Sequence, residues 1–270
     1  MRMQRHSGFI HRFLSGILIG IGCILPGVSG GVMALSFGLY YPALDALLGF
    51  FGNVKKHLRF LAPIAMGGGA GLLIGAKALS GLMMHSGDLM LFLFIGFILG
   101  GAPELWSKAR CTPCRRLGWM ALGLLASLPL LLTGTERSSV ALLSPMQSFL
   151  TGLLEGVGTI IPGVSTSMVL IRLGWYGAYL KLVSGLIWPQ ILWMATGFAL
   201  SAVLCMHAVK LLFDRHPAVA YSAVLGFLLG SVALVFPGFD PFPRCFAQLG
   251  HAVIGIITVR WLNQIDIPKR

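Results

Sequence analysis

Charged residues are scarce in this sequence. Asp, Glu, Lys and Arg make up only 10% of its 270 residues, whereas about a quarter of an ordinary soluble domain is charged. Hydrophobic residues account for 56% of the chain, and the mean hydropathy is +0.86. This composition argues against a water-soluble fold. The length leaves room for roughly six to eight membrane segments of about 20 residues each, with no separate soluble domain beside them.

Cysteine is also sparse, with five residues in the whole chain. Cys111 and Cys114 form a single CxxC beside basic residues. A zinc site would need a second pair of ligands nearby, and the sequence has none. We therefore expect reduced thiols in a cytoplasmic loop, no metal site and no cofactor.

Acidic residues are the rarer of the two charge types, with eight Asp and Glu against 20 Lys and Arg and a net charge of +12. The basic residues fall in short clusters between apolar runs, as in the cytoplasmic loops of membrane proteins. We therefore expect no nucleic-acid partner. Arg2, Arg5 and Arg12 precede the first apolar run as in a signal peptide, but this run continues through Pro26 without a convincing cleavage site. We expect it to be retained.

A long internal repeat is the clearest pattern in the chain. Residues 13–47 align with residues 149–183 at a constant offset of 136. Both copies contain the motif Pro-Gly-Val-Ser, at Pro26–Ser29 and at Pro162–Ser165. The constant register over 35 residues indicates a duplication.

The duplication extends over most of the chain, because residues 96–100 weakly resemble residues 226–230 downstream. We therefore expect a single membrane domain, residues 1–270, with repeat halves 13–133 and 149–260.

Each motif segment is too short to cross a membrane twice. Phe13 to Leu25 is 13 residues, about 20 Å of helix, against a hydrocarbon core of about 30 Å. Arg12 precedes the segment, and Lys55 and Lys56 follow it. By the positive-inside rule both ends then face the cytoplasm, which predicts a re-entrant hairpin rather than one broken span.

Three spans between the two hairpins make the second hairpin enter from the opposite face. We therefore predict an all-α integral membrane protein with an inverted-topology repeat, two re-entrant helical hairpins and about six transmembrane helices. Both termini are expected in the cytoplasm, and the loop around Gly134 to Ser144 outside. Inverted repeats are typical of secondary transporters, whose substrate site lies at the repeat interface near mid-membrane. The predicted spans are Leu61–Met84, Leu89–Trp106, Leu117–Thr133, Leu186–Val209, Ala218–Phe236 and Phe246–Arg260.

The two Pro-Gly-Val-Ser loops are the first candidate binding site. Proline suits the first position of a helix, and glycine lets backbone amides approach a ligand. If return helices span Val28 to Ala34 and Val164 to Leu170, their free N–H groups and positive dipole ends would bind an anion. The alternative is that the glycines only permit close helix packing. The candidate substrate-binding residues of the loops are Pro26, Gly27, Val28, Ser29, Gly30, Gly31, Pro162, Gly163, Val164, Ser165, Thr166 and Ser167.

Three ionisable residues within the membrane complete the candidate substrate-binding set: Arg172, Glu155 and Lys77. Such residues are costly in a bilayer and usually mark a pathway or a pair. Arg172 could hold a phosphate by a forked contact, or it could pair with Glu155 and hold the hairpin together. For Lys77 the alternative is snorkelling to an interface. Glu104, near the end of its span, is expected to be a loop-edge residue.

The paired motifs resemble those of the bacterial polyprenyl-phosphate (undecaprenyl-phosphate) translocase family. The motifs read ILPGVSGG and IIPGVSTS, and each is followed by Gly-x-Tyr, at Gly38 to Tyr40 and at Gly174 to Tyr176. The resemblance covers essentially the whole chain. It implies a flippase that returns undecaprenyl phosphate or a related polyprenyl phosphate from the outer to the inner leaflet of the bacterial cytoplasmic membrane, for envelope polymer synthesis.

The resemblance also implies an anionic polyprenyl-phosphate lipid in the bilayer as the partner, and it leaves a coupling proton or cation open. The sequence departs from the family pattern in the first hairpin. Cys23 and Ile24 stand where the family often has Ala-Asp, and Tyr41 stands where it often has Glu. No role carries over to acidic residues at these positions.

Two other functions stay open from the residues alone. Gly27 to Gly30 matches the GxSG string of intramembrane serine proteases, with Ser29 as nucleophile and His207 or His251 as base. A single nucleophile does not require a duplicated loop, so we expect no enzyme activity. The other alternative is a small-anion or ion channel or transporter. A channel should have a continuous aqueous pore, whereas a lipid site should open sideways to the bilayer.

Overall fold

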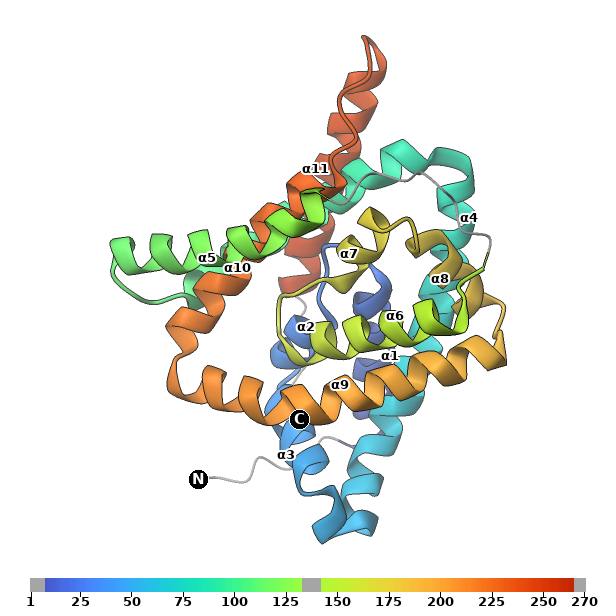
Figure 1. Ribbon diagram of the computed structural model, residues 1–270, viewed down its shortest axis with the longest axis vertical. Helices are drawn as coiled ribbons and strands as arrows, with labels where there is room; N and C mark the ends of the chain where they lie inside the picture. Colours follow the sequence, from blue (N-terminus) through green and yellow to red (C-terminus); the bar gives the residue numbers. More distant parts are fainter. Residues whose placement is uncertain (1–7, 133–141, 265–270) are drawn as a thin grey trace.

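The fold is helical throughout the described residues, which are 8–132 and 142–264 in a computed structural model (Figure 1). The loop predicted around Gly134 to Ser144 lies largely outside these residues, as do both chain ends. The helices are α1 (Phe9–Ile24), α2 (Gly30–Ser36), α3 (Tyr40–Leu48), the short 3-10 helix η1 (Phe50–Gly52), α4 (Val54–Lys108), α5 (Pro113–Leu132), α6 (Pro145–Ile160), α7 (Thr166–Arg172), α8 (Tyr176–Ser184), α9 (Trp188–Arg215), α10 (Pro217–Val235) and α11 (Arg244–Gln264).

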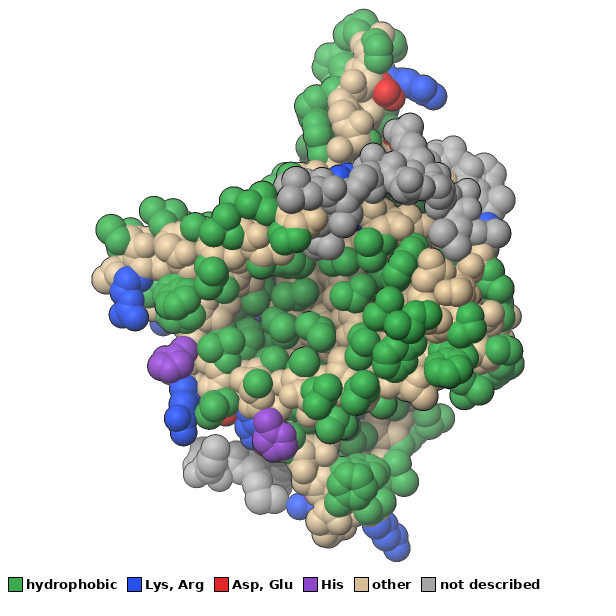
Figure 2. Space-filling view, viewed as in Figure 1, with side chains coloured by type: hydrophobic (Ala, Val, Ile, Leu, Met, Phe, Trp, Pro, Cys, Tyr) green, Lys and Arg blue, Asp and Glu red, His purple; other side chains and the backbone are tan. Residues whose placement is uncertain are grey.

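Four helical segments of the described chain are long and apolar enough to cross a membrane. They are Val54–Met83, Asp88–Lys108, Trp188–Arg215 and Pro217–Val235. Figure 2 shows apolar side chains over most of one face, with lysine and arginine at its margins. Large apolar side chains facing outward suit contact with lipid tails and not with water. The chain is therefore a membrane protein.

Helix α4 contains both spans that the sequence predicted in this part of the chain. Its apolar segments Val54–Met83 and Asp88–Lys108 match the predicted spans Leu61–Met84 and Leu89–Trp106 closely, and the helix runs for 55 residues through both. Figure 1 shows the helix changing direction between its two apolar parts. The polar residues between the two segments continue the helix and do not form a loop.

The two motif segments have the same order and lengths of helix. Helices α1 and α6 have 16 residues, α2 and α7 have seven, and α3 and α8 have nine. Sixteen residues give about 24 Å of helix, less than the hydrocarbon core of about 30 Å. Helices α1 and α6 are thus too short to cross the core, as the sequence predicted for the segments before each proline.

A sharp bend follows each seven-residue helix, and the glycine of Gly-x-Tyr makes it. Gly38 and Gly174 have φ of +66° and +70°, in the left-handed region that favours glycine. The Gly38 N–H donates to Leu35 O, and the next N–H donates to Ala34 O. This is the Schellman pattern of a helix C-terminus. The bend sets α3 at 107° to α2.

Glycines also bring the first helix of each motif against the following long helix. A Cβ atom at Gly20 on α1 would collide with the Gly68 carbonyl on α4. A Cβ atom at Gly152 on α6 would collide with the Met194 carbonyl on α9. Small residues permit such close approach in bilayers. Gly20 and Gly152 therefore serve close helix packing.

Candidate functional site: the crossing of the two loops

The two Pro-Gly-Val-Ser loops lie against each other and exchange hydrogen bonds. The Gly27 N–H donates to Ser165 Oγ at 3.0 Å, and the Gly163 N–H donates to Ser29 Oγ at 2.9 Å. All four groups are buried. Residues 138 and 134 positions apart therefore meet in a reciprocal contact, which we call the loop crossing.

The serines are positioned by the start of the return helices. These helices begin at Gly30 and Thr166, two residues later than predicted. Ser29 and Ser165 are their N-cap residues, but neither side chain caps its own helix. Each hydroxyl instead accepts a hydrogen bond from the opposite loop.

The prolines have a different role from the predicted one. The Val28 N–H donates to Leu25 O across Pro26 and Gly27, and Gly27 has φ of +83°. Proline second, glycine third and a closing hydrogen bond are the marks of a type II turn. Pro26 therefore makes the turn before the helix, not the first helical position. Pro162 stands in the same pattern.

The two loop glycines are also required by their neighbours. A Cβ atom at Gly27 would lie 2.8 Å from the Phe94 carbonyl and 2.9 Å from the Ile98 nitrogen, both on α4. A Cβ atom at Gly163 would lie 2.6 Å from a Val224 methyl group. The sequence predicted that the loop backbone would approach a ligand closely. In the structure, the backbone at these glycines approaches other parts of the protein instead.

Two tyrosines bind across the crossing. The Tyr40 hydroxyl donates to Ile160 O at 2.5 Å, and the Tyr176 hydroxyl donates to Ile24 O at 2.8 Å. These carbonyls belong to the last residues of α6 and α1. Helix ends leave carbonyls without helical partners, so each tyrosine satisfies the helix end of the other repeat. The tyrosine of Gly-x-Tyr is therefore part of the crossing.

A small cavity of about 30 Å³ lies at the crossing and is lined by Gly27, Ser29, Gly163 and Glu104, among others. Its size suits about one water molecule. The Glu104 Oε1 atom is paired with Lys108 Nζ at 2.6 Å, while its buried Oε2 has no hydrogen-bond partner. Glu104 was predicted to be a loop-edge residue, yet it faces the loops. In the sequence, the spacing of four residues between Glu104 and Lys108 was the signal that these side chains could pair on one helix face.

The other three ionisable candidates lie at different distances from the loop crossing. Glu155 is buried near the crossing, interacts with the Thr166 side chain, and has an Oε1 atom without a hydrogen-bond partner. Arg172 is half-buried at the far end of α7, about 10 Å along the helix from Ser165. Lys77 is exposed on α4. The structure thus brings Glu155 to the loops, but neither Arg172 nor Lys77.

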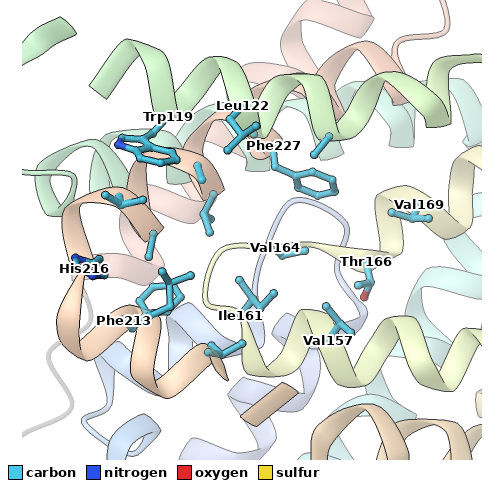
Figure 3. A pocket seen from close by; sticks show the side chains of 18 of the residues that line it. Trp119, Leu122, Val157, Ile161, Val164, Thr166, Val169, Phe213, His216 and Phe227 are labelled. Atoms are coloured by element: carbon cyan, nitrogen blue, oxygen red, sulfur yellow. The ribbon is translucent and has the colours of Figure 1, made fainter. Parts of the chain in front are cut away.

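A large apolar groove of about 1050 Å³ adjoins the second loop (Figure 3). Helices α5, α6, α9 and α10 form its walls, and Ile161, Val164 and Thr166 close it on the loop side. Its volume is at the upper end for small-molecule sites. The lining residues on α5 run from Arg115 to Pro129, about 21 Å of helix. Figure 2 shows this apolar face hollowed between α5 and α6.

The histidines proposed as a protease base lie apart from Ser29. His207 is exposed on α9, and His251 Nδ1 is 2.7 Å from Ala247 O in its own helix. The Ser29 hydroxyl accepts from a backbone amide. This arrangement does not form a nucleophile and base.

Comparisons with known proteins identify the family of the chain. The undecaprenyl phosphate translocase-like family matches residues 1–115 and 112–243. A Vibrio cholerae protein named polyprenyl-phosphate transporter is 23% identical over 250 residues, covering 85% of this chain and 78% of the relative. A Staphylococcus aureus protein of the same name is 26% identical over 274 residues, covering 93% and 95%. No solved structure matches significantly. The chain belongs to the undecaprenyl phosphate translocase-like family.

Proposed function

We propose that this protein transports undecaprenyl phosphate or a related polyprenyl phosphate from the outer to the inner leaflet of the bacterial cytoplasmic membrane. The apolar groove that adjoins the second loop carries this proposal, since it suits a long hydrocarbon chain. The family and the names of both relatives support the same substrate. A groove in an apolar face also fits sideways entry from the bilayer better than an aqueous channel does.

We further propose that the two halves form an inverted repeat whose re-entrant hairpins meet at mid-membrane. The equal helix lengths and the reciprocal bonds of the loop crossing support this arrangement. Both termini would be cytoplasmic. Cysteine-accessibility mapping in intact cells tests the topology, and external labelling between Lys55 and Arg59 would contradict the first re-entrant hairpin.

The loop crossing acts as the closed gate in this proposal. Its cavity holds about one water, so the loops must separate before a phosphate can pass. Separation frees the Gly27 and Gly163 amides and both serine hydroxyls. Neutral hydrogen bonds contribute about 0.5–1.5 kcal/mol each, and bonds to charged groups about 1.5–3 kcal/mol. A phosphate can therefore replace the loop-to-loop bonds at a gain.

The three ionisable candidates have separate roles in this scheme. Glu155, buried with an unpartnered oxygen beside the crossing, is the candidate carrier of a coupling proton. Arg172 would contact the phosphate only after the loops part, because it lies at the far end of α7. Lys77, exposed on α4, would act at the lipid-facing surface.

Transport of a fluorescent polyprenyl phosphate in proteoliposomes tests the function. Ala126 lines the groove on α5, and Ala121 is exposed on the same helix without lining it. Ala126→Trp should fill the groove and abolish transport, while Ala121→Trp should leave transport intact. Equal activity of the two variants, or passage of inorganic phosphate with no lipid transport, would contradict the proposal.

A further inference from the structure

A second cavity of about 190 Å³ lies at one end of the apolar groove. The two cavities are adjacent, because they share four lining residues: Arg115, Trp119, His216 and Val219. Arg215 and Cys111 complete the polar part of the second cavity. We call Arg115, Arg215 and His216 the basic mouth of the groove. Figure 3 shows Trp119 and His216 at one end, and Thr166 and Val169 at the other.

The charge of the basic mouth is not neutralised by the described residues. Neither Arg115 nor Arg215 forms a hydrogen bond or ion pair within the described part of the chain. No ion pair joins either arginine to the neighbouring Asp214 among the described residues.

The neighbouring basic residues of the same loop have partners of their own. The Lys108 ammonium is paired with Glu104, and the Arg116 guanidinium stacks on Trp106 at 4.4 Å. Arg115 and Arg215 are therefore the guanidinium groups that remain available to an anion at the mouth.

We propose that the basic mouth binds the phosphate-monoester headgroup of a lipid whose hydrocarbon chain lies in the groove. This inference rests on the proposed function and adds a headgroup site away from the loop crossing. A phosphate monoester carries about −1.5 to −2 charges near pH 7, which two guanidinium groups can match by forked contacts. Trp119 lies between the polar and apolar parts, where aromatic side chains prefer to sit.

The position of the basic mouth indicates the side of the membrane on which the headgroup is held. Arg115 lies in the first turn of α5 and Arg215 ends α9, so residues beside two loops distant in sequence supply the charge. Both loops are basic, and the positive-inside rule assigns both to the cytoplasmic face. The mouth is therefore the place where the headgroup waits at that face, about 21 Å along α5 from the far end of the groove.

Lipid binding to the purified full chain in phosphatidylcholine nanodiscs tests this site. The probes are undecaprenyl phosphate and its neutral counterpart, undecaprenol. The double variant Arg115→Gln/Arg215→Gln should bind undecaprenyl phosphate roughly a hundredfold more weakly, about tenfold for each lost charged contact. Its affinity for undecaprenol should not change. Salt should weaken phosphate-lipid binding to the unmodified protein more than to this variant.

Arg110→Gln is the matched control, because Arg110 is exposed in the same loop and lines neither cavity. Its affinity for both lipids should equal that of the unmodified protein. Arg115→Lys/Arg215→Lys keeps the charge and loses the fork, so its affinity should be intermediate.

Three results would overturn the headgroup site. They are unchanged binding of undecaprenyl phosphate by the double Gln variant, an equal loss of both lipids, and complete displacement by an equal amount of phosphatidylglycerol. If the unmodified protein transports polyprenyl phosphate but the double variant binds it normally, only the headgroup site fails. If the unmodified protein neither binds nor transports this lipid, the proposed function fails as well.

Discussion

Removing one serine hydroxyl from the loop crossing should destabilise the protein by a predictable amount. In Ser29→Ala the Gly163 N–H stays buried and loses its acceptor. An unsatisfied buried donor costs about 1–3 kcal/mol. Ser165→Ala should cost the same, because the Gly27 N–H is equally buried and its bond differs by only 0.1 Å, at 3.0 against 2.9 Å. The melting temperature in detergent should therefore fall by similar amounts in both variants.

The double variant Ser29→Ala/Ser165→Ala distinguishes a reciprocal crossing from two independent hydrogen bonds. Once one bond is lost, the loops can move apart and water can reach the second amide, so the second loss should cost less than the first. A coupling of at least about 0.5 kcal/mol is expected for such neighbours. Ser36→Ala is the control, since the Ser36 hydroxyl is exposed and donates to Val32 O in its own helix.

Transport by the single serine variants should be reduced but not lost, because the loop amides remain for the phosphate. Fluorescent polyprenyl phosphate in proteoliposomes measures this effect. Loss of activity in Ser29→Ala alone, with covalent labelling of Ser29 by a fluorophosphonate, would refute the reasoning in favour of a serine nucleophile. Unchanged stability in both variants would refute the crossing itself.

Three further predictions concern the loops and α7. Gly27→Ala should lower the melting temperature more than Gly163→Ala, because the added Cβ meets backbone atoms of α4 in the first case and side-chain atoms in the second; the reverse order would contradict the packing described. Tyr40→Phe should destabilise by about 1–3 kcal/mol in denaturant unfolding, since it strands the buried Ile160 carbonyl. Tyr176→Phe should cost less, because Ile24 O also accepts from Ser167 Oγ at 3.4 Å, and the reverse order would count against these contacts. Arg172→Lys should keep partial transport and Arg172→Ala should lose more, at unchanged folded yield in membranes, because only the first retains the charge; lower yield without a specific transport defect would instead indicate a structural role.

Local signals in the sequence were sufficient for the motif helices. The register of the repeat predicted two segments of matching helices, and the structure has helices of equal length in both. The short apolar runs before each proline predicted helices too short to span the core. These features depend on composition, chain direction and turn residues within a few positions, so no knowledge of distant contacts was needed.

Contacts between distant residues could not be predicted in the same way. The sequence suggested that the loop hydroxyls face a ligand, whereas Ser29 and Ser165 accept from each other's loop. The tyrosines of Gly-x-Tyr gave no sign that their partners are helix ends about 120 and 152 residues away. The sequence predicted both apolar parts of α4, but not that the polar residues between them would continue the helix.

The two repeats have matching backbone contacts at the crossing but different charged residues. The crossing is reciprocal, and its hydrogen bonds involve neutral groups in both directions. In contrast, Glu155 and Arg172 of the second repeat correspond to Ile19 and Ser36 of the first. A reciprocal gate by itself gives the loops no preferred way to part. A preference between the two faces must therefore come from the one-sided features, which are these charges, the apolar groove and its basic mouth. Substitutions at the crossing should then change how often the gate opens, while substitutions at the mouth should change on which side the lipid is held.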